Sequence, residues 1–165
     1  MRLTFLGTRG EIEARTRQHR MHSSLLAAHG ACVVMIDCRA DWLKHVMNLR
    51  ANSIFLTHAH SDHAGGLKNS APCEVFCNGP RLGRSYRVKL YPVEHSLIAP
   101  AVGYRVTGAG HSIFYVPDVA SIPEVARALS GIAMYIGDGA TISRPLVRRR
   151  DSALIGYAPI TTQLQ

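Results

Sequence analysis

The chain has 165 residues and a formal charge of +8, from 19 Lys and Arg against 11 Asp and Glu. This length is expected to form one domain, residues 1–165, large enough to bury a sizeable core. Apolar residues make up 47% of the chain, which excludes a disordered protein. No apolar run approaches the roughly 18 residues of a membrane helix. The N-terminus reaches Gly7 too early for a signal peptide, so we expect a cytoplasmic protein with no membrane partner.

The positive charge comes almost entirely from 16 arginines, against 3 lysines. A guanidinium group presents a planar fork of donors that matches phosphate and carboxylate geometry, which favours a small anionic substrate. A soluble surface with a basic bias explains the excess equally well. The arginine run 148–150 has no alternating aromatic residues of the kind that bind single-stranded nucleic acid, so nucleic acid is the less favoured partner.

Hydrophobic patterning predicts a strand-rich chain with interspersed helices. Helices are expected at 41–49 and 122–129, the second with Pro123 in its first turn. Residues 24–28 and 31–36 flank His29-Gly30 and are expected to form a hairpin. The other expected strands are 2–6, 53–56, 74–77, 88–91, 101–106, 112–116, 134–136 and 153–155. This order fits a layered α/β domain better than a helical bundle or a pure barrel.

The segment 57–67, with the sequence THAHSDHAGGL, carries the strongest chemical signal. His58, His60, Asp62 and His63 lie within six residues, directly after an expected buried strand. Imidazole nitrogens and a carboxylate are the ligands of zinc and similar metals. His58 and His60 are two apart and can converge on one ion, whereas Asp62 and His63 are displaced toward a second. Solvated loops rarely hold three histidines, so we predict a metal site here.

The pattern His-x-His-x-Asp-His resembles the hallmark of the metallo-β-lactamase fold superfamily, and the resemblance covers essentially the whole chain. It implies an α/β (α+β) fold, a four-layer αβ/βα sandwich with a dinuclear site at one edge of its two sheets. It also implies that His58 and His60 bind the first metal, and that Asp62 and His63 bind the second. Zn²⁺, one or two ions, is the expected cofactor, with Mn²⁺ or Fe²⁺ as alternatives.

Three further positions match this family. His95 follows the expected strand 88–91 and would complete the first metal's histidine trio; the alternative is an ordinary loop histidine. Asp118 follows the strand 112–116 and resembles the carboxylate that bridges the two metals, although a strand-end aspartate also serves as a helix cap. Asp37 matches an aspartate that supports the metal ligands from behind. The family's usual glycine two positions later is Arg39, and arginine is unfavourable where φ is positive.

The chemistry follows from these ligands. Two divalent ions lower the pKa of a shared water and polarise the scissile phosphoryl or carbonyl group. Asp62 is the predicted catalytic group that orients the resulting hydroxide or accepts its proton.

Segments 134–141 and 156–160 resemble the phosphodiesterase and ribonuclease Z-like branch of the superfamily, which shifts the expected substrate toward phosphodiesters. Only 22 residues separate His95 from Asp118, too few for the projecting arm that grips tRNA, so a small phosphodiester fits better. Tyr157 stands where this branch has a catalytic histidine. A tyrosine donates a hydrogen bond but is a poor proton carrier at neutral pH.

The family's last metal histidine follows a further strand, and the sequence ends at Gln165 without one. We therefore expect a sandwich that lacks its last strand and helix, with a weak second metal. His19, His22 and His111 are expected to be surface or substrate-loop residues rather than replacement ligands. Apolar surface left uncovered would favour aggregation or a homodimer.

Three functions are compatible with the sequence. The first is a metal-dependent hydrolase of phosphodiesters that uses metal-activated water. The second is a degenerate member that binds metal but has little activity, because Tyr157 replaces a histidine and the last metal histidine is absent. The third is a thioester or lactone hydrolase on the same fold.

Overall fold

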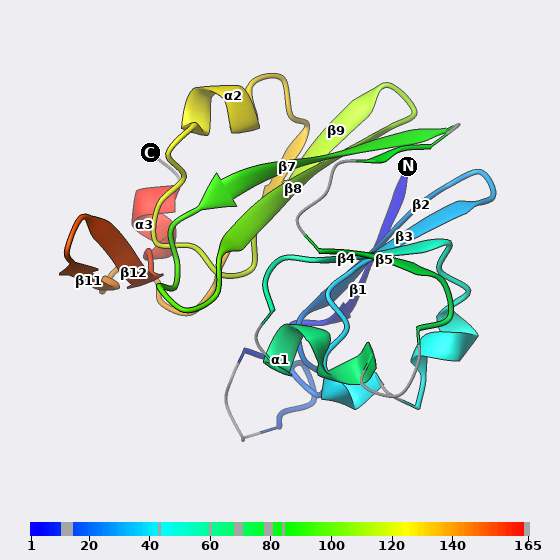
Figure 1. Cartoon of the computed structure of the whole chain (residues 1–165), viewed down its shortest axis with the longest axis horizontal. Helices are drawn as coiled ribbons and strands as arrows, with labels where there is room; N and C mark the ends of the chain where they lie inside the picture. The colour runs from blue at the N-terminus through cyan, green and yellow to red at the C-terminus, as the bar shows by residue number, and fades with distance from the viewer. Residues whose placement is uncertain are drawn as a thin grey trace. The chain divides into compact units, whose positions relative to one another are not determined.

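The computed structural model describes residues 1–10, 15–42, 44–59, 61–67, 71–77, 81–83 and 85–163; the side chains of residues 61, 62 and 82 lie outside this description. The chain divides into two compact units (Figure 1). The N-terminal unit is Met1–Gly79 with Arg84–Tyr86, and the C-terminal unit is Pro80–Gly83 with Arg87–Gln165. That the chain forms a single domain stays a prediction.

The N-terminal unit is built on a five-stranded sheet of order β1-β2-β3-β4-β5. Strand β2 is antiparallel to both of its neighbours, β1 and β3, whereas β3, β4 and β5 run parallel. The carboxyl ends of these parallel strands therefore meet at one edge of the sheet, which positions the loops that follow them. The strands are β1 (Arg2–Gly7), β2 (Ser24–His29), β3 (Cys32–Ile36), β4 (Ser53–Leu56) and β5 (Glu74–Cys77).

One face of this sheet is covered by two short 3₁₀ helices, η1 (Ala40–Trp42) and η2 (Val46–Leu49). Trp42 and Val46 pack with strand residues into a buried apolar cluster. The predicted continuous helix over 41–49 is wrong. Hydrogen bonds of the i→i−3 type, such as Trp42 N–H to the Arg39 carbonyl, tighten both turns into 3₁₀ geometry.

The predicted hairpin between β2 and β3 is confirmed, with Gly30 in the left-handed region at φ 58°. The strand predicted at 53–56 is β4, and all four of its residues are buried. Directly after it come α1 (Ser61–Ala64) and η3 (Gly65–Leu67). The predicted metal-binding segment thus begins at the end of a central, buried strand.

The C-terminal unit contains a second five-stranded sheet of order β10-β9-β8-β7-β6. Strands β8 and β9 form an antiparallel hairpin, and β9 pairs in parallel with β10. Helix α2 (Val125–Leu129) packs Ala128 and Leu129 into the unit's apolar cluster. The strands are β6 (Arg81–Leu82), β7 (Tyr86–Val93), β8 (Ala101–Gly108), β9 (His111–Tyr115) and β10 (Met134–Ile136).

Aromatic packing fixes the core of this second sheet. The Phe114 ring stacks on Tyr135, with 6.2 Å between centroids, and meets Tyr91 edge-on at 5.9 Å. A Cβ at Gly103 would lie 2.4 Å from the Phe114 ring, so β8 needs a glycine there to admit the aromatic side chain.

A separate two-stranded hairpin closes the described chain (Figure 1, orange to red). Its strands are β11 (Leu146–Arg150) and β12 (Ala153–Tyr157), followed by helix α3 (Ile160–Gln163). The sequence pattern predicted only residues 153–155 of this hairpin and neither β11 nor α3. The predicted helix 122–129 is also shortened to α2, since residues 123 and 124 form a turn before it. Within the described residues, no helix has the length and apolar character to cross a membrane.

Candidate metal centre

In the N-terminal unit, Asp37 and Thr57 build the base of the predicted metal site. Asp37 follows β3 and Thr57 follows the neighbouring parallel strand β4, so both lie at the same sheet edge. The Asp37 carboxylate accepts the Thr57 N–H at 2.8 Å and the Thr57 hydroxyl at 2.9 and 3.0 Å. Both residues are fully buried, and this pairing compensates the cost of burying the carboxylate.

The same two residues hold the imidazoles of His58 and His63. Nδ1 of His63 lies 2.9 Å from an Asp37 carboxylate oxygen, and the Thr57 hydroxyl lies 3.1 Å from Nδ1 of His58. The two rings are 3.9 Å apart between centroids. Because Nδ1 of each ring contacts an oxygen, Nε2 is the atom that each ring offers to a metal. A carboxylate behind a histidine is the arrangement that orients metal ligands and raises their basicity.

The family's glycine two positions after Asp37 suggested a positive φ at position 39. In the structure, the residue with positive φ is Asp37 itself. Asp37 is in the left-handed region at φ 62°, whereas Arg39 is not among the positive-φ residues. Aspartate is one of the few side chains that tolerate this conformation. The turn therefore forms with arginine at position 39, and the Arg39 side chain is buried at 2% exposure.

Gly66 lets the metal-binding segment pack against this turn. Its N–H donates to the Cys38 carbonyl, and a Cβ here would lie 2.4 Å from the Arg39 carbonyl oxygen. The Cys38 N–H donates in turn to the His63 carbonyl at 2.8 Å. Gly66 thus has a packing role behind the histidines. His60 lies outside the described residues, as does the side chain of Asp62, so their predicted roles stay predictions.

In the C-terminal unit, His95 is fixed by the β11–β12 hairpin. It follows β7, is 8% exposed, and its Nδ1 lies 3.0 Å from the Gly156 carbonyl oxygen. The Gly156 N–H donates back to the His95 carbonyl at 2.9 Å. Because a carbonyl oxygen only accepts, Nδ1 of His95 is the donor and Nε2 is the atom that can bind a metal. His63 in the N-terminal unit is held through Nδ1 in the same way, but its acceptor is a carboxylate and not a backbone carbonyl.

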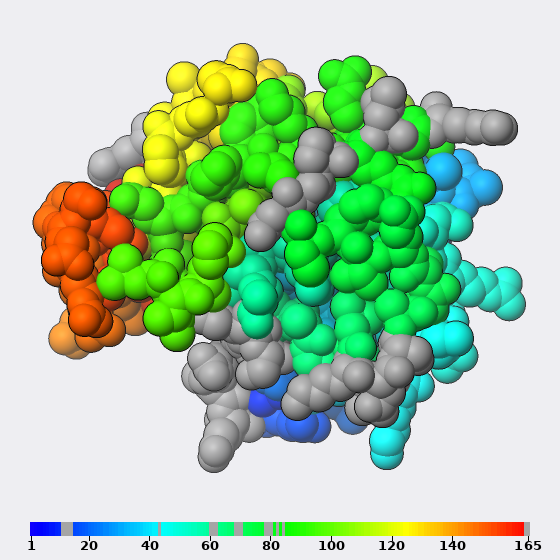
Figure 2. Space-filling model, in the orientation of Figure 1, coloured from blue at the N-terminus to red at the C-terminus, as the bar shows by residue number. Residues whose placement is uncertain are grey.

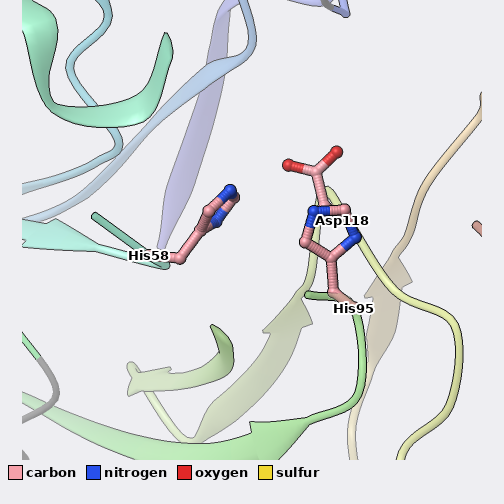
Figure 3. A group of neighbouring side chains, drawn as sticks. All are labelled: His58, His95 and Asp118. Atoms are coloured by element: carbon pink, nitrogen blue, oxygen red, sulfur yellow. The ribbon is translucent and has the colours of Figure 1, made fainter. Parts of the chain in front are cut away.

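Asp118 lies beside His95 in the C-terminal unit. A carboxylate oxygen of Asp118 and a ring nitrogen of His95 are within 4.8 Å of each other (Figure 3, which also draws His58). The two loops are joined by the Glu94–Ser121 bridge, with hydrogen bonds from Glu94 N–H to the Ser121 carbonyl and from Ala120 N–H to the Glu94 carbonyl. Backbone pairing therefore brings these two candidate ligands together.

Asp138 is a site residue to which the sequence reasoning assigned no role. It follows β10, the parallel neighbour of the strand that precedes Asp118, and is 7% exposed. Burial raises its pKa to about 7, and the negative charge of Asp118 adds to the shift. Oδ1 accepts the Ala140 N–H at 2.7 Å, whereas Oδ2 has no hydrogen-bond partner among the described residues. The sequence signal that could have identified Asp138 is an acidic residue shortly after a short predicted strand.

Gln163 connects the Asp138 segment to the end of the hairpin. Its side-chain amide donates to the carbonyls of Asp138 at 3.0 Å and Ala158 at 2.7 Å, and its oxygen accepts from the Tyr135 hydroxyl at 2.9 Å. Tyr157, the predicted catalytic residue, lies at the end of β12 with its ring 5.1 Å from the His95 ring. Its position beside His95 allows the predicted role, which stays a prediction.

The other histidines are engaged elsewhere. Nδ1 of His22 lies 2.6 Å from an Asp41 oxygen and 2.9 Å from the Arg9 guanidinium. Burial, with the positive charges of Arg39 and Arg9, lowers the His22 pKa. His19 contacts the Thr8 hydroxyl, and His111 is exposed at the start of β9. In the described part of the chain, none of these three histidines joins a group of candidate metal ligands.

The residues present therefore fit a divalent metal. Imidazoles fixed through Nδ1 and a neighbouring carboxylate are the donors that zinc and similar ions prefer. Asp138 lies in the same unit as His95 and Asp118, and the negative charge of Asp118 contributes to its raised pKa.

Comparison with known proteins agrees with this picture. No protein-family model matches the chain. Ribonuclease Z of Methanococcus maripaludis is 25% identical over 151 residues, which cover 76% of this chain and 47% of that protein. The chain thus spans about half the length of the curated relatives it matches.

Solved structures establish the fold. A diphosphatase from the PhnP family matches with a TM-score of 0.69 at 16% identity, covering 98% of this chain and 79% of that chain. Zinc-bound PqqB from Methylobacterium extorquens matches with a TM-score of 0.66 at 13% identity, covering 86% and 73%. The chain has the metallo-β-lactamase fold, as its histidine motif predicted. The proteins it resembles come from the ribonuclease Z and PhnP-like branch of that fold.

Proposed function

We propose that the protein is a metal-dependent hydrolase that cleaves phosphodiesters with metal-activated water, and that its metal is zinc. The proposal is based on one observation: in each unit, a hydrogen bond to Nδ1 fixes the orientation of a histidine ring. Asp37 holds His63 in one unit and the Gly156 carbonyl holds His95 in the other, each through Nδ1. Ribonuclease Z among the relatives and a PhnP-family diphosphatase among the structures support a phosphate ester as substrate.

The proposed ligands divide between two metal positions. His58, His60 and His95 would hold the first ion, Asp62 and His63 would hold the second, and Asp118 would contribute to both. A bound divalent ion would lower the pKa of its water and polarise a phosphoryl oxygen. Asp62 orients that water and accepts its proton, and the Tyr157 hydroxyl donates a hydrogen bond to the leaving oxygen. The overall charge of +8 favours an anionic substrate.

Turnover of bis(4-nitrophenyl) phosphate, measured together with the zinc content per chain, tests the proposal. We expect turnover to fall at least about 100-fold in His58→Ala and in His95→Ala, because each loses a ligand of the first metal. His111→Ala is the matched control, since this exposed histidine of the C-terminal unit should change turnover less than about two-fold.

A thioester and a lactone offered in parallel separate the competing functions. Turnover of these esters without turnover of the phosphodiester would replace the proposed substrate class. Zinc binding without turnover of any ester would identify a weakly active member, which the substitution of histidine by Tyr157 favours. No bound metal would contradict the proposal altogether.

A further inference from the structure

The β11–β12 hairpin carries the densest positive charge in the C-terminal unit. Four arginines fall between residues 144 and 150, and the only acid between residues 144 and 157 is Asp151 in the turn. All four are exposed, and Figure 2 shows the hairpin, in orange, on the surface. They are Arg144, Arg148, Arg149 and Arg150.

These arginines are not neutralised within the described part of the chain. No hydrogen bond or ion pair connects them to a described residue, whereas Arg9 pairs with Asp41 and Arg127 pairs with Glu124. Their cross-strand partners are apolar: Arg148 faces Ile155, Arg149 faces Leu154 and Arg150 faces Ala153. Four guanidinium groups without a carboxylate partner leave a field that attracts polyanions.

The hairpin is attached to a candidate metal ligand. The Gly156 backbone exchanges two hydrogen bonds with His95, and the Leu154 N–H donates to the Glu94 carboxylate at 3.4 Å. Arg148 pairs with Ile155, the residue next to Gly156. Arg149 and Arg150 follow at about 3.3 Å per residue. Because successive side chains of a strand point to opposite faces, Arg148 and Arg150 share one face of the hairpin and Arg149 lies on the other.

We propose that this hairpin is a phosphate-binding arm for a single-stranded oligonucleotide, which rests on the proposed phosphodiesterase function. The bond to be cleaved lies at the metal site, and phosphates farther along the strand contact Arg148 and Arg150 on one face of the hairpin. A small phosphodiester has one phosphate and gives these arginines nothing to bind. Guanidinium groups bind phosphate oxygens in pairs of hydrogen bonds. Such backbone binding needs no aromatic residues, so their absence from the run 148–150 does not argue against it.

Fluorescence anisotropy of a labelled 12-nucleotide 2′-O-methyl RNA, with zinc-loaded protein, tests the arm. The triple variant Arg148→Ala/Arg149→Ala/Arg150→Ala should bind about 10- to 100-fold more weakly at 100 mM salt. Its plot of log affinity against log salt should be shallower by about 1.4, because each of the two lost contacts with a single strand removes about 0.7. Turnover of bis(4-nitrophenyl) phosphate should change less than about two-fold, since this small substrate does not reach the arm.

A matched triple variant controls for net charge. Arg2→Ala/Arg17→Ala/Arg87→Ala removes three exposed arginines outside the hairpin and should weaken binding less than about three-fold. Replacement of Arg148, Arg149 and Arg150 by lysine should restore more than half of the salt dependence, because the charge returns without the planar fork. Circular dichroism confirms that each variant folds.

Several results would contradict the proposed role of the hairpin in phosphate binding. Equal losses in both triple variants would show an effect of overall charge alone. Undiminished binding of an uncharged methylphosphonate 12-mer would show that phosphates are not recognised. Loss of binding to phosphatidylserine vesicles, with oligonucleotide binding intact, would assign the arginines to a membrane surface. A DNA 12-mer measured in parallel shows whether the 2′ position contributes.

Binding is measured separately from turnover. An inactive protein that still binds the oligonucleotide through the hairpin would therefore contradict only the hydrolase proposal.

Discussion

Asp37 combines two features that rarely occur in one residue, a left-handed backbone at φ 62° and a buried carboxylate that holds an imidazole. An aspartate or asparagine is tolerated at this backbone conformation, but only the carboxylate accepts from His63 with full negative charge. The site therefore depends on the charge at this position and not on its shape alone.

Asp37→Asn should lower zinc affinity and phosphodiester turnover by about 10- to 100-fold, because the amide cannot replace the charged acceptor behind His63. Isothermal titration with zinc and the turnover assay measure the two effects. Asp151→Asn is the control, since Asp151 also has a positive φ, 55°, but is exposed in the β11–β12 turn. Similar losses in both variants would show that backbone strain, not the carboxylate, explains the result.

Asp138 should make the stability of the metal-free protein depend on pH. Burial and the Asp118 charge raise its pKa in the folded state to about 7, above its usual value of 3.8. The folded state therefore holds this proton more tightly than the unfolded state. The contribution to stability is complete below about pH 4 and is lost as the pH rises through about 7.

Asp138→Asn should remove this dependence. At pH 8, with a chelator present, we expect the variant to be more stable than the parent by about 1–3 kcal/mol, and the difference should vanish near pH 4. Thermal unfolding followed by circular dichroism at several pH values measures it. A constant difference at all pH values would mean that Asp138 does not titrate in this range.

At the level of elements, parallel strand ends and tight turns determine which side chains meet. Asp37 and Thr57 come together because β3 and β4 are parallel neighbours, and Asp118 and Asp138 follow the parallel pair β9 and β10. The turn after α1 packs against Cys38 and Arg39, which follow β3, only because Gly66 has no side chain.

Gly66→Ala tests this close approach. The new Cβ would lie 2.4 Å from the Arg39 carbonyl oxygen and 2.7 Å from the Cys38 sulfur, so the backbone must move. We expect a loss of about 2–4 kcal/mol in unfolding free energy and a reduced zinc content. Gly10→Ala, where nothing lies within 4 Å of an added Cβ, should change stability by less than about 0.5 kcal/mol. Denaturant titrations of the two variants compare them directly, and equal stability of Gly66→Ala and the parent would refute the packing role.

At the level of the whole molecule, the proposed ligands are distributed over both units. His58 and His63 belong to the N-terminal unit, whereas His95 and Asp118 belong to the C-terminal unit. If one ion takes ligands from both units, zinc should stabilise the folded chain as a whole, by about 2.7 kcal/mol at 100 times the dissociation constant.

Removal of a ligand from either unit should then abolish this stabilisation. We expect the zinc-induced rise in Tm to disappear in His58→Ala and equally in His95→Ala, while His111→Ala retains it. Calorimetry with and without zinc provides the measurement. A rise that survives in one of the two variants would assign the metal to a single unit. The cytoplasmic location and the homodimer expected from the sequence stay predictions at this scale.

The sequence by itself determined the fold class and the candidate ligands. A run of three histidines and an aspartate after an apolar strand is a local pattern, and metal chemistry restricts the residues that can form it. Most strands were also predictable, because their apolar residues lie close together in the sequence.

Only the tertiary structure decided which side chains support the ligands. The contacts of Asp37 with His63 and of Gly156 with His95 join residues 26 and 61 positions apart, and they depend on strand pairing that no local pattern reports. The pKa of Asp138 likewise depends on burial and on the charge of Asp118. The arginine excess first suggested an anionic substrate, and three of these arginines lie exposed on the hairpin that holds His95. The physical reason is that a local pattern determines which residues a segment carries, whereas pairing between distant strands determines what surrounds them.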